Sequence, residues 1–368
     1  MREGWEIKKL GEVCKTFTDG DWIESKDQAN SGIRLIQTGN IGNGIFKDKD
    51  EHYKFISNDT FEELSCTEIF EGDILISRLP EPIGRACIIP SIKCRMITAV
   101  DCTIVRPNES ILPKYLIYYT RSKEYYNNIK TYITGAVRKR ISRANLAKVS
   151  VPIPPLPEQQ KIVEELECVS KMIELKKKQL ETYDKLAQSI FYDMFGDPIT
   201  NEKGWPTCKV IQVVTMQRGY DLPVQNRNID GLIPVYGSNG IVGYHDTEKV
   251  KNGIITGRSG TLGKVYSMTT PFWPLNTTLF SIDTHDNNIT FLKYLITNYK
   301  LERYRAGAGV PTLNRNNFHN DTIISIPLSL QQQFAEKIEA IEKQKELIKQ
   351  TLKSLEELFN SRMDYYFN

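Results

Sequence analysis

Cations gathered in one segment are the residues of this sequence best suited to chemistry, because they could hold phosphate groups. Between positions 121 and 148 the chain carries eight Lys or Arg residues and a single carboxylate, Glu124. Tyr125, Tyr126 and Tyr132 lie among them, and cations interleaved with aromatic rings are typical of a surface that contacts nucleic acid. A solvated helix face has the same composition, so charge alone leaves both interpretations open. The cations are Arg121, Lys123, Lys130, Arg138, Lys139, Arg140, Arg143 and Lys148.

A glycine-rich segment at 257–264 resembles a phosphate-binding loop but has the wrong spacing. Five residues rather than four separate Gly257 from Gly263. Val265 stands where the loop would need a hydroxyl side chain to bind magnesium. We therefore predict that this segment binds no nucleotide.

Histidine, cysteine and acidic residues show no spacing typical of a catalytic or metal site. The four histidines (His52, His245, His285 and His319) include no local pair, and the seven cysteines contain no C-x-x-C motif. The carboxylates are scattered and form no cluster that would hold the metals of a nuclease. We expect free thiols, no catalytic residue, no metal and no cofactor.

Composition and hydropathy place the chain among soluble proteins with real cores. It has 368 residues, 40% of them hydrophobic and 25% charged, which excludes collagen-like and wholly disordered chains and favours more than one domain. No stretch approaches 18 consecutive apolar residues, and the first residues lack an apolar signal core. The sequence predicts a cytoplasmic protein with no membrane association.

The chain contains two copies of one plan. The order of the matching segments is the same in both copies, while their separation falls from 200 residues to 172, so the second copy has shorter loops. The matches pair Arg78 with Arg258 and Arg143 with Arg315, and place Lys264 close to the equivalent of Arg85. The matching segments are 4–13 with 204–213, 72–78 with 252–258, 143–146 with 315–318, and 156–164 with 328–336.

Each copy consists of an α+β domain followed by a long helix. Residues 1–150 and 204–325 contain short apolar runs between turn residues, which predict strands, and mixed segments that predict helices. Residues 151–203 and 326–368 each open on a proline-containing turn and continue with apolar residues spaced alternately by four and three. Such a heptad seam must be covered. We predict that the two helices pair with each other as an antiparallel coiled coil.

The positive charge belongs to the α+β domains. Residues 1–150 hold 23 basic and 20 acidic side chains, and residues 204–328 hold 12 and 8, whereas both helical segments are mildly acidic. A lysine interrupts each helical seam, at Lys176 and Lys345. Each lysine could fix the register of the helix pair, or its stem could cover the seam while the ammonium group reaches water.

These features together resemble the specificity (S) subunit of type I restriction-modification systems, and the resemblance spans the whole chain. It is carried by VPIPPLPEQQKIV at 151–163, SIFYDMFGD at 189–197 and LQQQF at 330–334. Residues 78–85 and 135–143 resemble one class of target recognition domain. Residues 234–240 with 257–258 resemble another.

The resemblance implies an α+β fold of two target recognition domains in pseudo-twofold repeat, joined by an antiparallel coiled coil of two long helices. It also implies a protein without catalytic activity that reads an asymmetric, two-part sequence in double-stranded DNA, with the helices setting the unread spacer. The implied protein partners are two methyltransferase (modification) subunits, which bind S-adenosylmethionine and methylate adenine, and restriction/translocase subunits, which use ATP.

The candidate DNA-binding residues come from both domains. The cations at 138–143 are expected to contact phosphates or guanine edges. Arg78 and Arg258 are expected either to read bases or to serve as ordinary turn residues. Lys264 and its counterpart Arg85 are expected to contact the DNA backbone, as is Arg315. Ser238 and Asn239 belong to a tight turn that could enter a groove. The full set is Arg78, Arg85, Arg138, Lys139, Arg140, Arg143, Ser238, Asn239, Arg258, Lys264 and Arg315.

Two other functions stay open from the residues alone. One is a stand-alone nuclease or methyltransferase whose active site is assembled from distant residues. The other is a coiled-coil assembly protein without a DNA role. The salt dependence of DNA binding separates the assembly protein from a DNA reader. When a protein binds DNA through phosphates, the logarithm of its binding constant falls with the logarithm of the salt concentration, with a slope of about −0.9 per phosphate contact.

Overall fold

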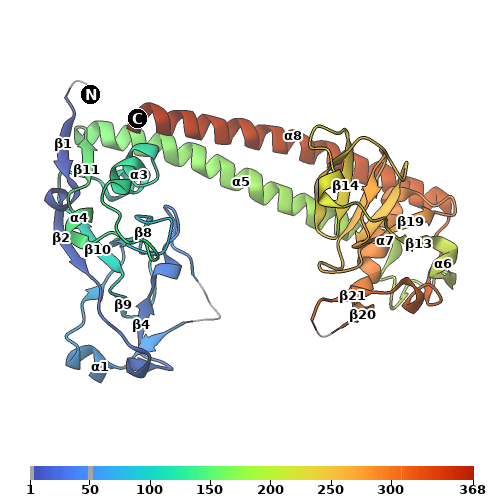
Figure 1. Cartoon of the computed structure of the whole chain (residues 1–368), viewed down its shortest axis with the longest axis horizontal. Coiled ribbons are helices and arrows are strands. Elements are labelled where there is room, and N and C mark those ends of the chain that lie inside the picture. The colour runs from blue at the N-terminus through green and yellow to red at the C-terminus, as the bar shows by residue number, and fades with distance from the viewer. Residues whose placement is uncertain (1–3, 49–52, 308) are drawn as a thin grey trace. The chain divides into compact units, whose positions relative to one another are not determined.

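Two helices of 40 residues each are the longest elements of the computed structural model, which describes residues 4–48, 53–307 and 309–368. Helix α5 (Leu156–Phe195) starts directly after a proline turn, where a missing N–H costs nothing, and α8 (Leu328–Phe367) follows the equivalent turn. Both helices contribute to each of two compact units. The first unit contains Met1–Leu175 and Leu352–Asn368, and the second contains Lys176–Thr351 (Figure 1).

A four-stranded antiparallel sheet with the same strand order forms the centre of each unit. Fully buried apolar runs, Ile74–Ile76 and Ile254–Ile255, form the third strand of each sheet. The identical order confirms the repeat that the sequence predicted. In the first unit the order is β2 (Cys14–Asp19), β10 (Cys102–Pro107), β7 (Ile74–Ser77), β8 (Ala86–Ile88). In the second it is β13 (Thr215–Arg218), β19 (Thr278–Asp283), β16 (Gly253–Gly257), β17 (Val265–Met268).

Short elements around each central sheet also correspond between the units. The first strand of each copy pairs antiparallel with the strand that precedes the long helix: β1 (Glu6–Lys9) with β11 (Ser150–Ile153), and β12 (Thr207–Lys209) with β22 (Thr322–Ile324). The hydroxyl of Tyr299 donates to the carbonyl of Thr322 at 3.0 Å, as that of Tyr119 does to Ser150. The helices are α2 (Pro113–Tyr119), α3 (Lys123–Lys130) and α4 (Arg143–Leu146) in the first unit, and α6 (Val210–Val213) and α7 (Ile289–Tyr299) in the second.

The two copies differ in their smaller sheets. The first unit adds a five-stranded sheet and α1 (Asn58–Glu63), and the second adds a three-stranded sheet and a two-stranded hairpin. The five strands, in order, are β3 (Gln28–Ala29), β5 (Phe55–Ile56), β4 (Ile33–Ile36), β9 (Met96–Thr98) and β6 (Glu68–Ile69). The second unit has β15 (Gly240–His245), β14 (Ile233–Gly237), β18 (Trp273–Pro274), and the hairpin β20 (Arg305–Ala306) with β21 (Thr312–Leu313).

Helices α5 and α8 pack antiparallel to each other within each unit. In the first unit the carboxylate of Glu165, near the start of α5, accepts hydrogen bonds from Arg362 and Tyr366, near the end of α8. In the second unit the rings of Phe191 and Phe334 pack edge to face, 5.7 Å between centroids, so the end of α5 meets the start of α8. The predicted fold class is confirmed.

The seam lysine Lys345 forms an ion pair across the helix interface of the second unit. Its ammonium group lies 2.7 Å from Asp184 of α5 and 3.0 Å from Glu342 of its own helix, and its side chain is 14% exposed. Burial alone would lower the pKa of Lys345, but the hydrogen bonds to Asp184 and Glu342 outweigh it and raise the pKa. Lys176, by contrast, donates to Gln179 of its own helix at the surface.

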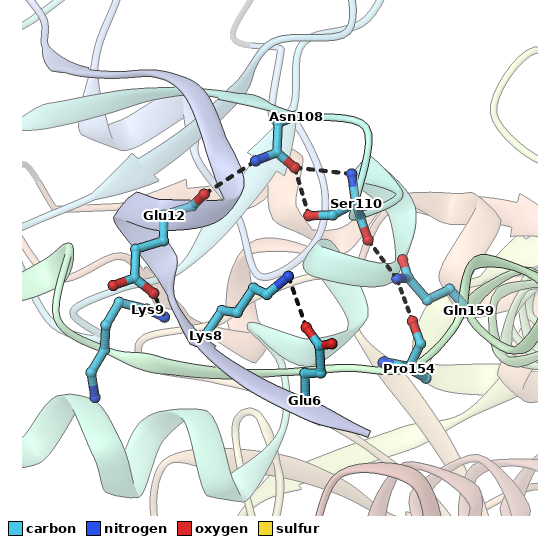
Figure 2. Close-up of polar contacts among 8 residues, drawn as sticks. All are labelled: Glu6, Lys8, Lys9, Glu12, Asn108, Ser110, Pro154 and Gln159. Carbon is cyan, nitrogen blue, oxygen red and sulfur yellow. Dashed lines mark hydrogen bonds and ion pairs between the residues drawn. The ribbon is translucent and has the colours of Figure 1, made fainter. Parts of the chain in front are cut away.

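A buried glutamine fastens each long helix to its domain. Gln159 accepts a hydrogen bond from the backbone N–H of Leu112 at 2.8 Å and donates to the carbonyls of Ser110 and Pro154, both at 2.9 Å. Figure 2 shows the two donated bonds, with Asn108 joining Ser110 to the carbonyl of Glu12. Because Gln159 is completely buried, its amide has no access to water.

Gln331 repeats this arrangement in the second unit. It accepts from the N–H of Asn288, the residue that caps α7, at 2.9 Å and donates to the carbonyl of Ile326 at 2.8 Å. Its amide also donates to the side chain of Asn287 at 2.6 Å. The two glutamines therefore attach the start of each long helix to the same unit's backbone.

Replacing Gln159 by leucine is expected to lower the free energy of unfolding by about 1–3 kcal/mol, because three backbone groups, at least partly buried, lose their partner. The measurement is urea denaturation of the full chain. Gln160 is exposed, and its side chain bonds to Glu164 one turn on, so Gln160→Leu is the matched control. An equal loss in both variants would contradict the role given to Gln159.

No helix within the described residues combines the length and the apolar character that a membrane span requires.

Candidate nucleic-acid interface

Arg78 and Arg258 occupy the same position in the two units, directly after the third strand of the central sheet. The N–H of Arg78 donates to Asp101 at 2.9 Å, and that of Arg258 donates to Thr277 at 2.8 Å. Their carbonyls accept from Ile141 at 3.3 Å and from Leu313 at 2.7 Å. The backbone of each arginine is thus bonded to the end of a surface loop that comes later in the chain, at Ile141 in the first unit and at Leu313 in the second.

The two arginine side chains differ in how much of their hydrogen-bonding capacity the fold uses. Arg78 is 13% exposed, forms an ion pair with Asp19 at 3.3 Å and donates to the carbonyl of Val100. Arg258 is half-buried and makes one long hydrogen bond, 3.4 Å, to the carbonyl of Asn276. Arg258 therefore retains more donors for a ligand than Arg78 does.

Residues 134–140 form an exposed hairpin, which we call the first hairpin. Thr134 and Arg140 exchange two backbone hydrogen bonds of 2.9 Å each. Gly135 at the turn has φ +102°, and a Cβ there would lie 2.4 Å from the carbonyl oxygen of Arg138. The charge of this segment was visible in the sequence. The hairpin that brings its cations together was not predicted.

The cations of this region fall into two groups. The side chains of Arg138 and Arg140 have no hydrogen bond or ion pair with any described residue, and Lys139 pairs with Glu81 at 3.2 Å in an exposed setting. Arg143 instead lies 3.6 Å from the carboxylate of Asp19, which also holds Arg78. Among the proposed residues of this unit, Arg138 and Arg140 on the first hairpin are therefore the cations whose side chains no described residue engages.

Arg85 is turned into the protein, contrary to the expectation that it contacts the DNA backbone. Only 8% exposed, it donates to the backbone carbonyls of Thr38 at 2.9 Å, Ile41 at 2.7 Å, Pro80 at 2.6 Å and Pro82 at 3.0 Å. Burial lowers its pKa. Its donors are used to hold two loops on the central sheet, which leaves them unavailable to phosphate.

Four of the proposed residues of the second unit come from two adjacent loops. Lys264, the counterpart of Arg85, is exposed and donates to the side chain of Asn239 at 2.9 Å. Ser238 packs against residues 257–264, which we call the glycine loop. A Cβ on Gly260 in this loop would lie 3.3 Å from the hydroxyl oxygen of Ser238. Arg258 lies at the start of the same loop.

A second hairpin, residues 305–313, corresponds to the first and was not predicted from the sequence. Arg305 pairs with Leu313 and Ala306 with Thr312, and residue 308 lies outside the described residues. The N–H of Gly260 donates to the carbonyl of Pro311 at 3.1 Å, so the hairpin rests on the glycine loop.

The sequence did contain a signal for the second hairpin, because Gly307 matches Gly135 at the 172-residue separation found for Arg143 and Arg315. Arg315 itself follows this hairpin at the start of a 3-10 turn (Arg315–Asn317) and is half-buried. Its side chain has no hydrogen bond or ion pair within the part of the chain that the structure describes.

His319 is a buried structural histidine. It is 7% exposed, and its Nε2 accepts a hydrogen bond from the N–H of Met216 at 3.2 Å, which requires the neutral ring. Burial, with a further effect of the Arg315 charge, lowers the pKa of His319. Across residues 4–48, 53–307 and 309–368, no group of three His, Cys, Asp or Glu side chains could hold a metal ion.

Acidification is expected to destabilise the second unit through His319. Below the ordinary histidine pKa of 6.5 the unfolded chain binds a proton that the folded ring resists, so the unfolding free energy falls as pH falls towards the folded-state pKa. The slope is at most about 1.4 kcal/mol per pH unit. Urea denaturation at pH 7.5 and 5.5 measures it. The His319→Gln variant should show a weaker pH dependence, and an unchanged one would contradict this assignment.

Comparison with known proteins places the chain beside one family. The family model described as the type I restriction modification DNA specificity domain matches residues 2–182 and 202–357. The MjaIX specificity subunit of Methanocaldococcus jannaschii is 27% identical over 248 residues, 60% of this chain and 54% of that protein. The StySPI specificity subunit of Salmonella potsdam is 34% identical over 191 residues, 49% of this chain and 39% of that protein. The chain spans about half the length of the curated relatives it matches.

Two solved structures share the fold. A chain from the structural study of complex assembly and conformational transition of the type I R-M system has a TM-score of 0.61 and 16% identity, covering 100% of this chain and 98% of its own. The type I restriction-modification S subunit from M. genitalium has a TM-score of 0.59 and 14% identity, covering 98% of this chain and 95% of its own.

Proposed function

Because this chain belongs to the family of type I restriction-modification DNA specificity subunits, we propose that it reads an asymmetric DNA target in two parts. One part is read by residues 1–150 and the other by residues 204–325, as two target recognition domains. Residues 151–203 and 326–368 supply the turns and helices that join them. The unread spacer between the two parts depends on these helices.

The observation that supports this proposal is that the two units share the same backbone arrangement but differ in their surface side chains. The central sheets have the same strand order, and Arg78 and Arg258 have equivalent backbone bonds. The first hairpin, however, presents three cations in a row, whereas the second has Val310-Pro311-Thr312 at the matching positions. Since base readout depends on side chains at groove edges, equivalent loops with unlike side chains favour two unlike half-sites.

In this proposal the chain is a non-catalytic member of a larger cytoplasmic complex. It would bring two methyltransferase subunits, which supply S-adenosylmethionine chemistry, and restriction/translocase subunits to the target. The likeness to a chain from a study of type I complex assembly supports such partners. The acidic long helices offer them a docking surface, besides pairing with each other.

Mapping methylated adenines tests the proposed function. The chain is expressed with its cognate modification subunit in cells that lack other adenine methyltransferases, and the genome is sequenced for N6-methyladenine. The expected result is one motif with two unlike halves and an unread spacer. The purified chain alone should transfer no methyl group, and methyl transfer by it alone would overturn the proposal.

A further inference from the structure

The two hairpins are built on the same backbone plan. Gly135 and Gly307 both have positive φ, +102° and +98°, and a Cβ on either would crowd the carbonyl oxygen three residues later, at 2.4 and 3.0 Å. A buried apolar residue follows the first hairpin (Ile141) and ends the second (Leu313), and its N–H bonds to the carbonyl of the arginine after the third strand. The same backbone bond thus anchors the base of each hairpin to its central sheet.

Val137 is an unusual residue for the tip of the first hairpin. Its side chain is fully exposed, although it is followed by three cations. It lines a hollow of about 310 Å³ together with Pro80, Glu81, Arg138 and Lys139. An exposed ion pair between Lys139 and Glu81, 3.2 Å, links the hairpin to the neighbouring loop. A β-branched apolar side chain is thus presented to solvent on a positively charged loop.

We propose that Val137 is a specificity-determining residue that contacts the 5-methyl group of a thymine in the major groove. This inference rests on the proposed function, because it needs a DNA target. The cations Arg138 and Arg140 lack partners among the described residues and would bind the phosphates that flank the groove. The exposed isopropyl group beside them can recognise only an apolar feature, and the thymine methyl is the apolar group that the major groove displays.

The test removes the thymine methyl group and nothing else. Duplexes containing the mapped target are made with each thymine replaced in turn by uracil, which keeps the O4 acceptor. The dissociation constant is measured by fluorescence anisotropy for the full chain with its modification subunit. We expect one thymine-to-uracil change to weaken binding about threefold to tenfold in the wild type. In Val137→Ala that same change should weaken binding less, because the variant side chain has lost two methyl groups and reaches less far.

Leu64→Ala is the matched control, because Leu64 is another exposed apolar residue of the first unit, 41% exposed at the end of α1. This variant should retain the full sensitivity to uracil. The proposal is overturned if no uracil change weakens wild-type binding, if the half-site has no thymine, or if Val137→Ala keeps the same sensitivity. Failure of the wild-type complex to bind the target specifically would instead overturn the proposed function itself, so the two failures are distinguishable.

Discussion

Replacing Arg138 and Arg140 together by alanine is expected to weaken DNA binding about tenfold to a hundredfold at physiological salt. Both guanidinium groups lie on the exposed first hairpin without an ion pair to any described residue, so neither has to leave a protein carboxylate to reach a phosphate. If each contacts one phosphate, the slope of log affinity against log salt should become shallower by about 0.9 per residue replaced. Anisotropy titrations at four salt concentrations measure both quantities.

A control of equal charge separates the hairpin from the net charge of the domain. Lys15 and Lys114 pair with Glu109 at 3.0 Å and with Glu167 at 2.6 Å in the same unit. The double variant Lys15→Ala, Lys114→Ala removes two positive charges but should leave the salt slope nearly unchanged. An equal effect of the two double variants would show that the hairpin has no special role.

Arg85→Ala is expected to lower the free energy of unfolding by about 3–5 kcal/mol, because removing a buried guanidinium leaves backbone carbonyls without donors. The carbonyls belong to Thr38, Ile41, Pro80 and Pro82. Urea denaturation measures the change.

Arg95 is the comparison for Arg85, because it is an exposed arginine that pairs with Glu68 at 3.0 Å. The variant Arg95→Ala should change stability little. At temperatures where Arg85→Ala stays folded, its salt slope for DNA should equal that of the wild type. A lower slope with unchanged stability would restore Arg85 to the DNA contacts.

The sequence predicted the parts of the fold that repeat or have a period. The alternation by four and three predicted α5 and α8, and the segment matches predicted two copies of one plan, each with an α+β domain. The equivalence of Gln159 and Gln331 was also visible in the segment match at 156–164. Their function as buried anchors was not, because a glutamine near a helix start is usually exposed.

Side-chain roles were less predictable, because burial is decided by tertiary packing. Arg85 and Lys264 occupy matching positions, yet Arg85 is buried under its neighbouring loops and Lys264 is exposed. Nothing in the local sequence distinguishes a cation that bonds to backbone carbonyls from one that is free for a ligand. The second hairpin was missed for a similar reason, since its strands are only two residues long and carry no alternating pattern.

Exchanging residues 204–325 for the corresponding domain of another specificity subunit, and then mapping methylated adenines in cells, tests most directly whether each domain reads its own half-site. The result predicted is a motif in which one half is new while the other half is retained. A motif changed in both halves, or in neither, in a chimera that still supports methylation would contradict the account.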